Sequence, residues 1–269
     1  MDLGVDSRAC LVTGASAGIG LASTRVLCAE GAQVLMVARD ADRLAAAAAG
    51  CLPVAEAGGG RVEHLAADVT DPAAAPRCVG SCVERFGRID VLVNNAGTTA
   101  LRGLEELSDE EWQRQWELNV MAPLRFMRET APLMAEQGHG RIVNVSSSAG
   151  KRPGLANAAY SVTKSAELSL SRVWADAYAS RGVLVNAVAP GPVSSPLWMG
   201  DGGLAAQSAA REGVSAQAAV EGMRARIPVG RLGTEEEVAD VIAFLCSDRA
   251  SFVAGSAWSV DGGYVPQFT

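Results

Sequence analysis

Basic residues and long apolar runs are both scarce in this chain of 269 residues. Twenty-three Lys and Arg residues stand against thirty Asp and Glu residues, and the net charge of −7 argues against nucleic acid or an anionic membrane as a bulk partner. No uninterrupted apolar run approaches the ~20 residues needed to span a bilayer. The acidic segment Met1–Asp6 lacks the basic start of a secretory signal. We therefore expect a cytoplasmic protein that binds neither membrane nor nucleic acid.

Metal-binding spacings are also lacking. The chain has two histidines, His64 and His139, and none of its six cysteines forms a C-x-x-C pair. Cys78 and Cys82 have helical spacing, but no histidine or second cysteine pair lies near them in sequence to complete a zinc site. We therefore predict no metal site, and reduced, buried thiols that act as small hydrophobic side chains.

Short apolar runs alternate with longer helical patterns along the whole chain. The predicted strands are Ala9–Val12, Gln33–Ala38, Val62–Ala66, Val91–Asn94, Arg141–Val145, Val183–Val188 and Ser256–Val260. The predicted helices are about Gly18–Glu30, Ala41–Ala49, Pro72–Phe86, Asp109–Glu136, Ala158–Ser180 and Glu235–Cys246. Strands joined by crossover helices form parallel sheets. The predicted fold class is therefore α/β: a single Rossmann-type doubly wound domain over residues 1–269, with a seven-stranded parallel sheet flanked by helices on both faces.

Local signals indicate where several helices begin. Ser108 with Glu111, and Thr234 with Glu237, have the S/T-x-x-E spacing of a capping box. The Asp71-Pro72 pair predicts a proline at the first helical position.

One connection is longer than the alternation of strands and helices requires. About forty residues between Pro190 and Arg231 hold only two small helical patches, and connections of that length in compact domains are usually functional. The segment follows the carboxyl end of a strand, where doubly wound folds bind ligands. It is either a tolerated surface insertion or a mobile lid, and its position favours a substrate lid at about residues 194–231.

A glycine-rich turn follows the first predicted strand and opens the first helix. It reads Thr13-Gly14-Ala15-Ser16-Ala17-Gly18-Ile19-Gly20. Glycines permit positive φ and close approach of the backbone to a ligand, and free N–H groups at a helix start attract a pyrophosphate. The same residues fit the G-x-S-x-G nucleophile elbow of α/β-hydrolases. That fold, however, needs several strands before the elbow and a histidine late in the chain, and no histidine follows His139. The turn therefore predicts a dinucleotide site.

The end of the second strand predicts which dinucleotide binds. Ala38 stands where an NAD site places an acidic residue, and Arg39 follows it. A guanidinium can bind a 2′-phosphate through charge-assisted hydrogen bonds. Asp40 is the counter-evidence, since its carboxylate could bind a ribose hydroxyl or simply cap the next helix. We predict NADP(H) as the preferred cofactor, with NAD(H) as the alternative.

Several separated segments together resemble the short-chain dehydrogenase/reductase family. They are Thr13 to Gly20, Asn94-Asn95-Ala96-Gly97, Asn119, Ser147, Tyr160-Ser161-Val162-Thr163-Lys164 and Pro190-Gly191. The resemblance runs from about Ala9 to Gly263, and the closing Val260-Asp261-Gly262-Gly263 is similar to the 3-oxoacyl-carrier-protein reductase-like branch. It implies reversible hydride transfer between a nicotinamide and a carbonyl or secondary alcohol.

The residues give this chemistry a physical basis. Tyr160 and Lys164 lie four residues apart and so share one face of a helix. A free tyrosine, with a pKa of about 10, is a poor base at neutral pH, but a nearby ammonium stabilises the phenolate. The resemblance implies that Ser147, thirteen residues before Tyr160, binds and polarises the substrate oxygen. It also implies that Asn119 holds a water linking Lys164 to solvent.

The turn and the resemblance together give the predicted site residues. Those expected to bind the cofactor are Gly14, Ser16, Ala17, Gly18, Ile19, Gly20, Arg39, Asp68, Val69, Asn95, Ala96, Gly97, Tyr160, Lys164, Pro190, Gly191, Val193 and Ser195. Those expected to contact substrate are Ser147, Ser148, Leu155, Tyr160 and Trp198. Asp68 could equally serve turn chemistry, and Ser195 stands where the family more often has threonine.

The resemblance also implies a homotetramer, built through the helices Asp109–Glu136 and Ala158–Ser180 and the last strand. Apolar residues all round the second helix fit such packing; they include Leu168, Leu170, Val173 and Trp174.

The alternative function is a catalytically silent NADP(H)-binding sensor on the same fold. Its signature would be loss of Ser147, Tyr160 or Lys164, and all three are present. The substrate stays open among hydrophobic ketones, 3-oxoacyl thioesters, polyketides and sugars.

Overall fold

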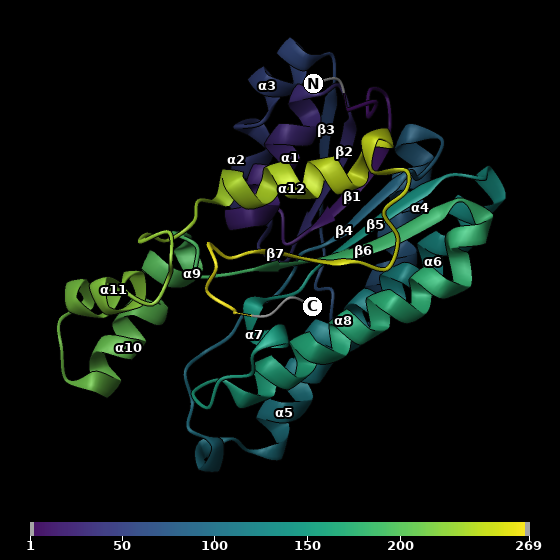
Figure 1. Ribbon diagram of the computed structural model, residues 1–269. Helices are drawn as coiled ribbons and strands as arrows, with labels where there is room; N and C mark the ends of the chain where they lie inside the picture. The colour runs from purple at the N-terminus through teal and green to yellow at the C-terminus, as the bar shows by residue number, and fades with distance from the viewer. Residues whose placement is uncertain (1–2, 267–269) are drawn as a thin grey trace.

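The computed structural model describes residues 3–266, which form one α/β domain around a single sheet (Figure 1). The strands are β1 (Ala9–Thr13), β2 (Gln33–Ala38), β3 (Arg61–Ala66), β4 (Val91–Asn94), β5 (Gly140–Val145), β6 (Val183–Pro190) and β7 (Ala257–Val260). All neighbours pair in parallel, in the order β3-β2-β1-β4-β5-β6-β7. The order reverses between β1 and β4, and ligands of doubly wound folds bind at such a point. The predicted fold class is confirmed.

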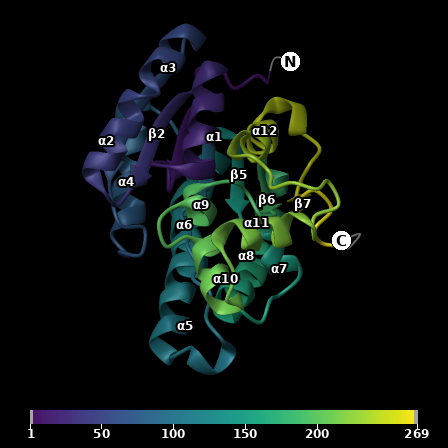
Figure 2. The same cartoon turned by 90° about the vertical axis from the view of Figure 1, so that its left-hand side faces the viewer.

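Helices cover both faces of the sheet (Figures 1 and 2). They are α1 (Gly18–Ala29), α2 (Ala41–Ala49), α3 (Leu52–Gly58), α4 (Ala74–Phe86), α5 (Asp109–Trp116), α6 (Ala122–Gln137), α7 (Ser148–Lys151), α8 (Ala158–Tyr178), α9 (Pro196–Met199), α10 (Leu204–Glu212), α11 (Ala216–Arg224) and α12 (Glu235–Cys246). Short 3₁₀ turns occupy Leu104–Glu106, Ala179–Arg181 and Asp248–Ala250.

Two hydrophobic cores lie on opposite faces of the sheet, because strand side chains alternate between faces. In β1, Cys10 and Val12 pack into the core beneath α1 and α12, whereas Ala9 and Leu11 pack into the core beneath α4, α6 and α8. The six cysteines are free and buried, as predicted. Across residues 3–266, no helix combines the length and the apolar character needed to cross a bilayer.

The predicted helix Asp109–Glu136 is interrupted. Between α5 and α6 lies a π-helical turn, Glu117–Met121, in which the N–H of Ala122 donates to the carbonyl of Glu117 five residues earlier. Pro123, near the start of α6, has no N–H to offer the carbonyl of Asn119. Such π turns often occur at functional sites, and this one carries Asn119.

Other boundaries differ by local chemistry. Helix α4 begins at Ala74 and not at Pro72, because the Asp71 carboxylate accepts from the N–H of Ala73 at 2.9 Å and closes a turn ahead of the helix. The sequence did not predict α3 or α7, which are too short to show a clear period. Both capping boxes are confirmed.

The long connection after β6 forms the short helices α9, α10 and α11, one more than predicted, and they project beyond the carboxyl edge of the sheet (Figures 1 and 2). A small core holds them together; it consists of Ala205, Val220, Ile227 and Leu232, with Trp198, Met223 and Tyr264 packed against it. The N–H of Leu101, in the loop after β4, donates to the Gln207 side chain at 2.7 Å. This three-helix unit therefore contacts the body across the site.

Candidate active site

A cleft of about 970 Å³ runs along the carboxyl edge of the sheet. Most of the predicted site residues line it: Gly14, Ser16, Ala17, Gly18, Ile19, Arg39, Val69, Asn95, Ala96, Gly97, Ser147, Ser148, Leu155, Tyr160, Lys164, Pro190, Gly191, Val193, Ser195 and Trp198. Gly20, Asp68 and Asn119 are not among its lining residues. The fold thus brings together segments that are far apart in the sequence.

The glycine turn is fastened to the end of β4. The Thr13 hydroxyl accepts from the backbone N–H groups of Asn95 and Ala96, at 3.0 and 3.1 Å. The backbone at Gly14 has a φ of +65°, and a Cβ there would lie 2.8 Å from the Cα of Ala96. Gly20 lies behind the turn, where a Cβ would lie 2.5 Å from the Gly14 carbonyl oxygen. Gly20 therefore serves packing, while Gly14 borders the cleft.

The start of α1 presents donors to the cleft. Gly18 and Ile19 line it, Gly18 has a φ of +60°, and the N-cap residue Ala17 provides no side-chain acceptor. The first N–H groups of a helix have no partners within the helix, and they carry the positive end of its dipole. This end of the cleft is suited to an anionic group such as a pyrophosphate.

Two arginines border the adenosine end expected from the sequence. Arg39 and Arg43 line the cleft, and 72% of the Arg39 side chain is exposed. The Asp40 carboxylate accepts from the N–H of Arg43 at 3.0 Å, so it caps α2 as one of the two readings expected. Asp68 accepts from the N–H and hydroxyl of Thr70, at 3.0 and 2.7 Å, which is turn chemistry. The second Asp68 oxygen lies 4.0 Å from the Arg39 guanidinium.

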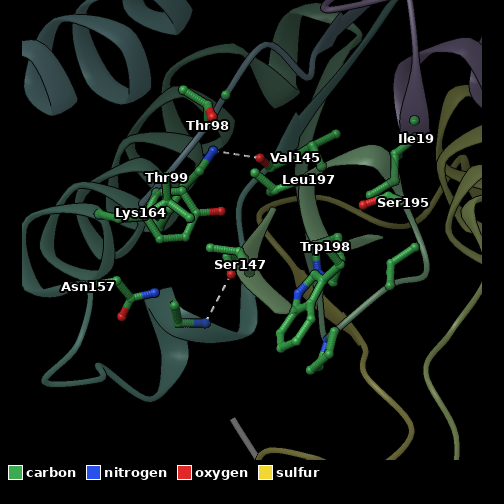
Figure 3. Close-up of a pocket in the computed structure, with 18 of the residues that line it drawn as sticks. Ile19, Thr98, Thr99, Val145, Ser147, Asn157, Lys164, Ser195, Leu197 and Trp198 are labelled. Atoms are coloured by element: carbon green, nitrogen blue, oxygen red, sulfur yellow. Dashed lines mark hydrogen bonds between the residues drawn. The ribbon is translucent and has the colours of Figure 1, made fainter. Parts of the chain in front are cut away.

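The three adjacent serines at the end of β5 have different surroundings. Ser146 donates to the carbonyl of Lys164 at 2.9 Å, and Ser148 is 7% exposed at the start of α7. The Ser147 oxygen accepts from the N–H of Ala149 at 3.1 Å (Figure 3). Because that contact occupies only a lone pair, the Ser147 hydroxyl hydrogen stays available to an acceptor in the cleft.

Lys164 lies beneath the cleft with its ammonium group fixed. Its Nζ donates to the carbonyl of Val145 at 2.8 Å (Figure 3) and lies 5.8 Å from the centre of the Tyr160 ring. Nζ also donates to the Glu167 carboxylate at 2.8 Å, a contact that was not predicted from the sequence. Burial opposes the charge on the lysine, but Glu167, with help from Tyr160, holds the pKa of Lys164 above its ordinary value.

Asn119 is fully buried at the π-helical turn. Its amide nitrogen donates to Gln115 at 2.7 Å and to the Thr163 hydroxyl at 3.1 Å. Its amide oxygen is the buried side-chain polar atom that lacks a hydrogen-bond partner within residues 3–266. A Cβ built on Gly97 would lie 3.4 Å from that oxygen and 3.6 Å from the Lys164 Nζ. An unsatisfied acceptor thus lies on the same side of Gly97 as the ammonium.

The outer walls are largely the expected ones. Leu155, which is 85% exposed, and Trp198 border the cleft, and Arg152, Arg226 and Tyr264 join them. Tyr264 was not predicted from the sequence, because its position depends on how the chain returns after β7. Lys151 faces elsewhere, since its Nζ donates to the carbonyl of Ala257 at 2.7 Å. Residues 3–266 contain no cluster of His, Cys, Asp or Glu able to hold a metal ion.

A doubly wound sheet, a glycine turn at its switch point, and Ser147, Tyr160 and Lys164 together at its carboxyl edge define an oxidoreductase of the α/β class. A family model described as enoyl-(acyl carrier protein) reductase matches residues 14–265. The 3-oxoacyl-(acyl-carrier-protein) reductase of Thermotoga maritima is 36% identical over 266 residues, which cover 97% of this chain and 99% of that protein. The cis-4-hydroxycyclohexanecarboxylate dehydrogenase of Sinomonas cyclohexanicum is 38% identical, with 96% of each chain covered.

A solved structure agrees with these relatives. L-sorbose reductase from Gluconobacter frateurii, complexed with NADPH and L-sorbose, superposes with a TM-score of 0.91 at 35% identity, and all of both chains is covered. The chain belongs to the short-chain dehydrogenase/reductase family, a family of oxidoreductases that act on C=O and CH–OH groups.

Proposed function

We propose that this protein is an NADP(H)-dependent oxidoreductase that interconverts a ketone or 3-oxoacyl-type carbonyl and the corresponding secondary alcohol. The observation that carries the proposal is that Ser147, Tyr160 and Lys164 line one cleft with the glycine turn. Asn119, buried beside Lys164, completes the proposed catalytic group.

The residues present fit a nicotinamide cofactor. The glycine turn and the start of α1 would hold its pyrophosphate, and Arg39, beside Arg43, would bind a 2′-phosphate. Two observations favour NADP(H). One oxygen of Asp40 caps α2, which accounts for this acidic residue without a ribose hydroxyl. L-sorbose reductase, a neighbour of high structural similarity, was solved with NADPH. The proposed contacts further along are Val69, Asn95 to Gly97, and Pro190 to Ser195. When bound, the cofactor supplies or accepts the hydride.

The protein's own groups manage the substrate oxygen and its proton. In the reducing direction the Ser147 hydroxyl donates a hydrogen bond to the carbonyl oxygen and stabilises the negative charge that develops there. Tyr160 gives its phenolic proton to that oxygen, and the Lys164 ammonium stabilises the phenolate that results. The unpartnered Asn119 oxygen, near the ammonium, is suited to accept from a water that returns the proton from solvent.

The substrate contacts proposed beside Ser147 and Tyr160 are Ser148, Leu155 and Trp198. We propose that residues of about 194–231 act as a lid over these contacts, since α9 to α11 have their own core and meet the body through Gln207. Exposed apolar side chains on α8, Val162 and Val173, support the proposed homotetramer. The cytoplasmic location expected from the sequence stays a prediction, in keeping with six free, buried cysteines.

The test is NADPH consumption with a panel of 3-oxoacyl thioesters, cyclic ketones, keto sugars, quinones and one enoyl thioester. Tyr160→Phe serves as the control because it removes the proton donor and keeps the ring. Turnover of a carbonyl compound that falls by about 10²–10⁴ in the variant supports the proposal. Turnover of the enoyl thioester alone would contradict it. Tight NADPH binding with no turnover across the panel would favour the silent sensor.

A further inference from the structure

Helix α8 carries a buried carboxylate next to the proposed catalytic lysine. Tyr160, Lys164 and Glu167 have the spacing i, i+4, i+7, which places all three on one helical face. The Glu167 Oε2 lies 2.8 Å from the Lys164 Nζ, and the two side chains are 1% and 3% exposed. A salt bridge this deeply buried gains little stability over apolar packing, so its presence calls for another explanation.

We propose that Glu167 is a positioning residue for the Tyr160–Lys164 pair: its carboxylate holds the ammonium against β5 and offsets part of the charge that the ammonium presents to Tyr160. The inference rests on the function proposed above, because it concerns how the lysine acts on the tyrosine.

Hydrogen-bond geometry supports the anchoring role. An ammonium has three N–H donors. One is directed to the carbonyl of Val145 and one to Glu167, both at 2.8 Å, so a single donor is left for the cleft. Glu167 therefore limits the number of orientations open to the Lys164 head group. Its own backbone is held in turn, since Ser171 donates to the Glu167 carbonyl and accepts from Asn144, both at 2.8 Å.

Charge supports the second role. Burial raises the pKa of Glu167 to about 7, against the opposing pull of the Lys164 ammonium. When it is ionised, the carboxylate weakens the field of the ammonium at Tyr160. The Lys164 ammonium lowers the pKa of Glu167, whereas Glu167 and Tyr160 both raise the pKa of Lys164.

The decisive measurement needs no substrate. The ionisation of Tyr160 is followed as the tyrosinate absorbance of a protein minus that of its Tyr160→Phe counterpart, over a pH titration. In Glu167→Gln, which keeps the shape and loses the charge, the midpoint should shift by about 0.5–1 unit, because the variant changes both the field of the ammonium and the Lys164 pKa that Glu167 holds up. Glu167→Asp keeps the charge and should restore the wild-type midpoint. Asp240→Asn, the same change of charge at an exposed site on α12, should leave it unmoved.

A second variant tests whether Glu167 anchors the Lys164 head group. Glu167→Met removes the acceptor as well as the charge, so it should shift the midpoint like Glu167→Gln and also raise the Kd of NADPH by about fivefold or more. The proposal is overturned if the Gln and Met variants titrate with wild-type midpoints while only their melting temperatures fall, or if Glu167→Asp shifts as far as Glu167→Gln. Failure of the carbonyl panel would not affect this titration, so loss of the proposed function and loss of this inference are distinguishable.

Discussion

The side-chain amide of Asn95 donates to the carbonyl oxygen of Gly14 at 3.2 Å and to that of Thr13 at 3.0 Å. This pair of hydrogen bonds ties the end of β4 to the turn after β1, across the switch point of the sheet. A Cβ on Gly20 would lie only 2.4 Å from the same amide nitrogen. The glycine turn is thus shaped by the protein's own packing as well as by the expected cofactor.

Gly20→Ala should therefore lower the free energy of unfolding by about 1–3 kcal/mol, because Asn95 or the turn must shift. Gly80→Ala is a matched control in the middle of α4, where an added Cβ meets no atom within 4 Å. That change should stabilise the protein by about 0.5–1 kcal/mol through helix propensity. Urea denaturation measures both, and changes of the same sign would contradict the packing argument.

Arg39→Ala should weaken NADPH binding by about tenfold or more and leave NADH binding nearly unchanged, since a charge-assisted hydrogen bond contributes about 1.5–3 kcal/mol. Titration of the protein with each nucleotide gives the two Kd values. Arg128→Ala, an exposed position on α6 outside the cleft, controls for the loss of one positive charge. An unchanged ratio of the two Kd values in Arg39→Ala would show that this guanidinium does not select the cofactor.

Acid should weaken the fold partly through His139. Its Nδ1 accepts from Arg8 at 3.1 Å, and its Nε2 donates to Asp248 at 3.2 Å. Burial, together with the charges of Arg141 and Arg8, lowers the pKa of His139 despite Asp248. The unfolded chain therefore binds this proton more readily, so the stabilisation is present above the ordinary histidine range and is lost as pH falls through it.

The measurement is the free energy of unfolding of wild type and His139→Gln between about pH 5.5 and 7.5. The wild type should lose about 1 kcal/mol more than the variant over that interval. The raised pKa of Glu167 gives the opposite slope, but it is common to both proteins and cancels in the difference. Parallel curves would rule out the contribution of His139.

Trp198→Ala should raise the KM of the carbonyl substrate by roughly tenfold and leave the Kd of NADPH within about twofold. The reason is that Trp198 both lines the cleft and packs against the core of α9 to α11. Met199→Ala, the exposed neighbour in α9, is the control. Equal effects on substrate and cofactor would indicate general loosening of α9 to α11 and not a substrate contact.

Local patterns were enough to predict much of this protein. The order of strands and helices, both capping boxes, the glycine turn and the Tyr160–Lys164 face all depend on residues a few positions apart. Errors arose where a short-range signal was weak. Helices α3 and α7 are too short to show a period, and the Asp71 turn displaced the start of α4.

The sequence did not predict the π-helical turn, and Pro123 does not by itself indicate one, since Pro132 lies within α6 without a π turn. Glu167 could have been found, because its spacing from Tyr160 and Lys164 places it on the same helical face. Its burial is what turns that spacing into a contact.

The sequence by itself determined the class of fold, the family and the set of candidate groups, because repeating polar and apolar spacing and short motifs are local properties. Only the tertiary structure distinguished between residues to which sequence patterns assign equal roles. In the structure Ser146 donates to the Lys164 carbonyl, whereas the Ser147 hydroxyl hydrogen stays available. Lys151 donates to β7, and Asp68 accepts within a turn. Two of these contacts, Ser146 with Lys164 and Lys151 with Ala257, join residues that are far apart in the chain. Such pairings exist only once the parallel strands bring their carboxyl ends to one edge.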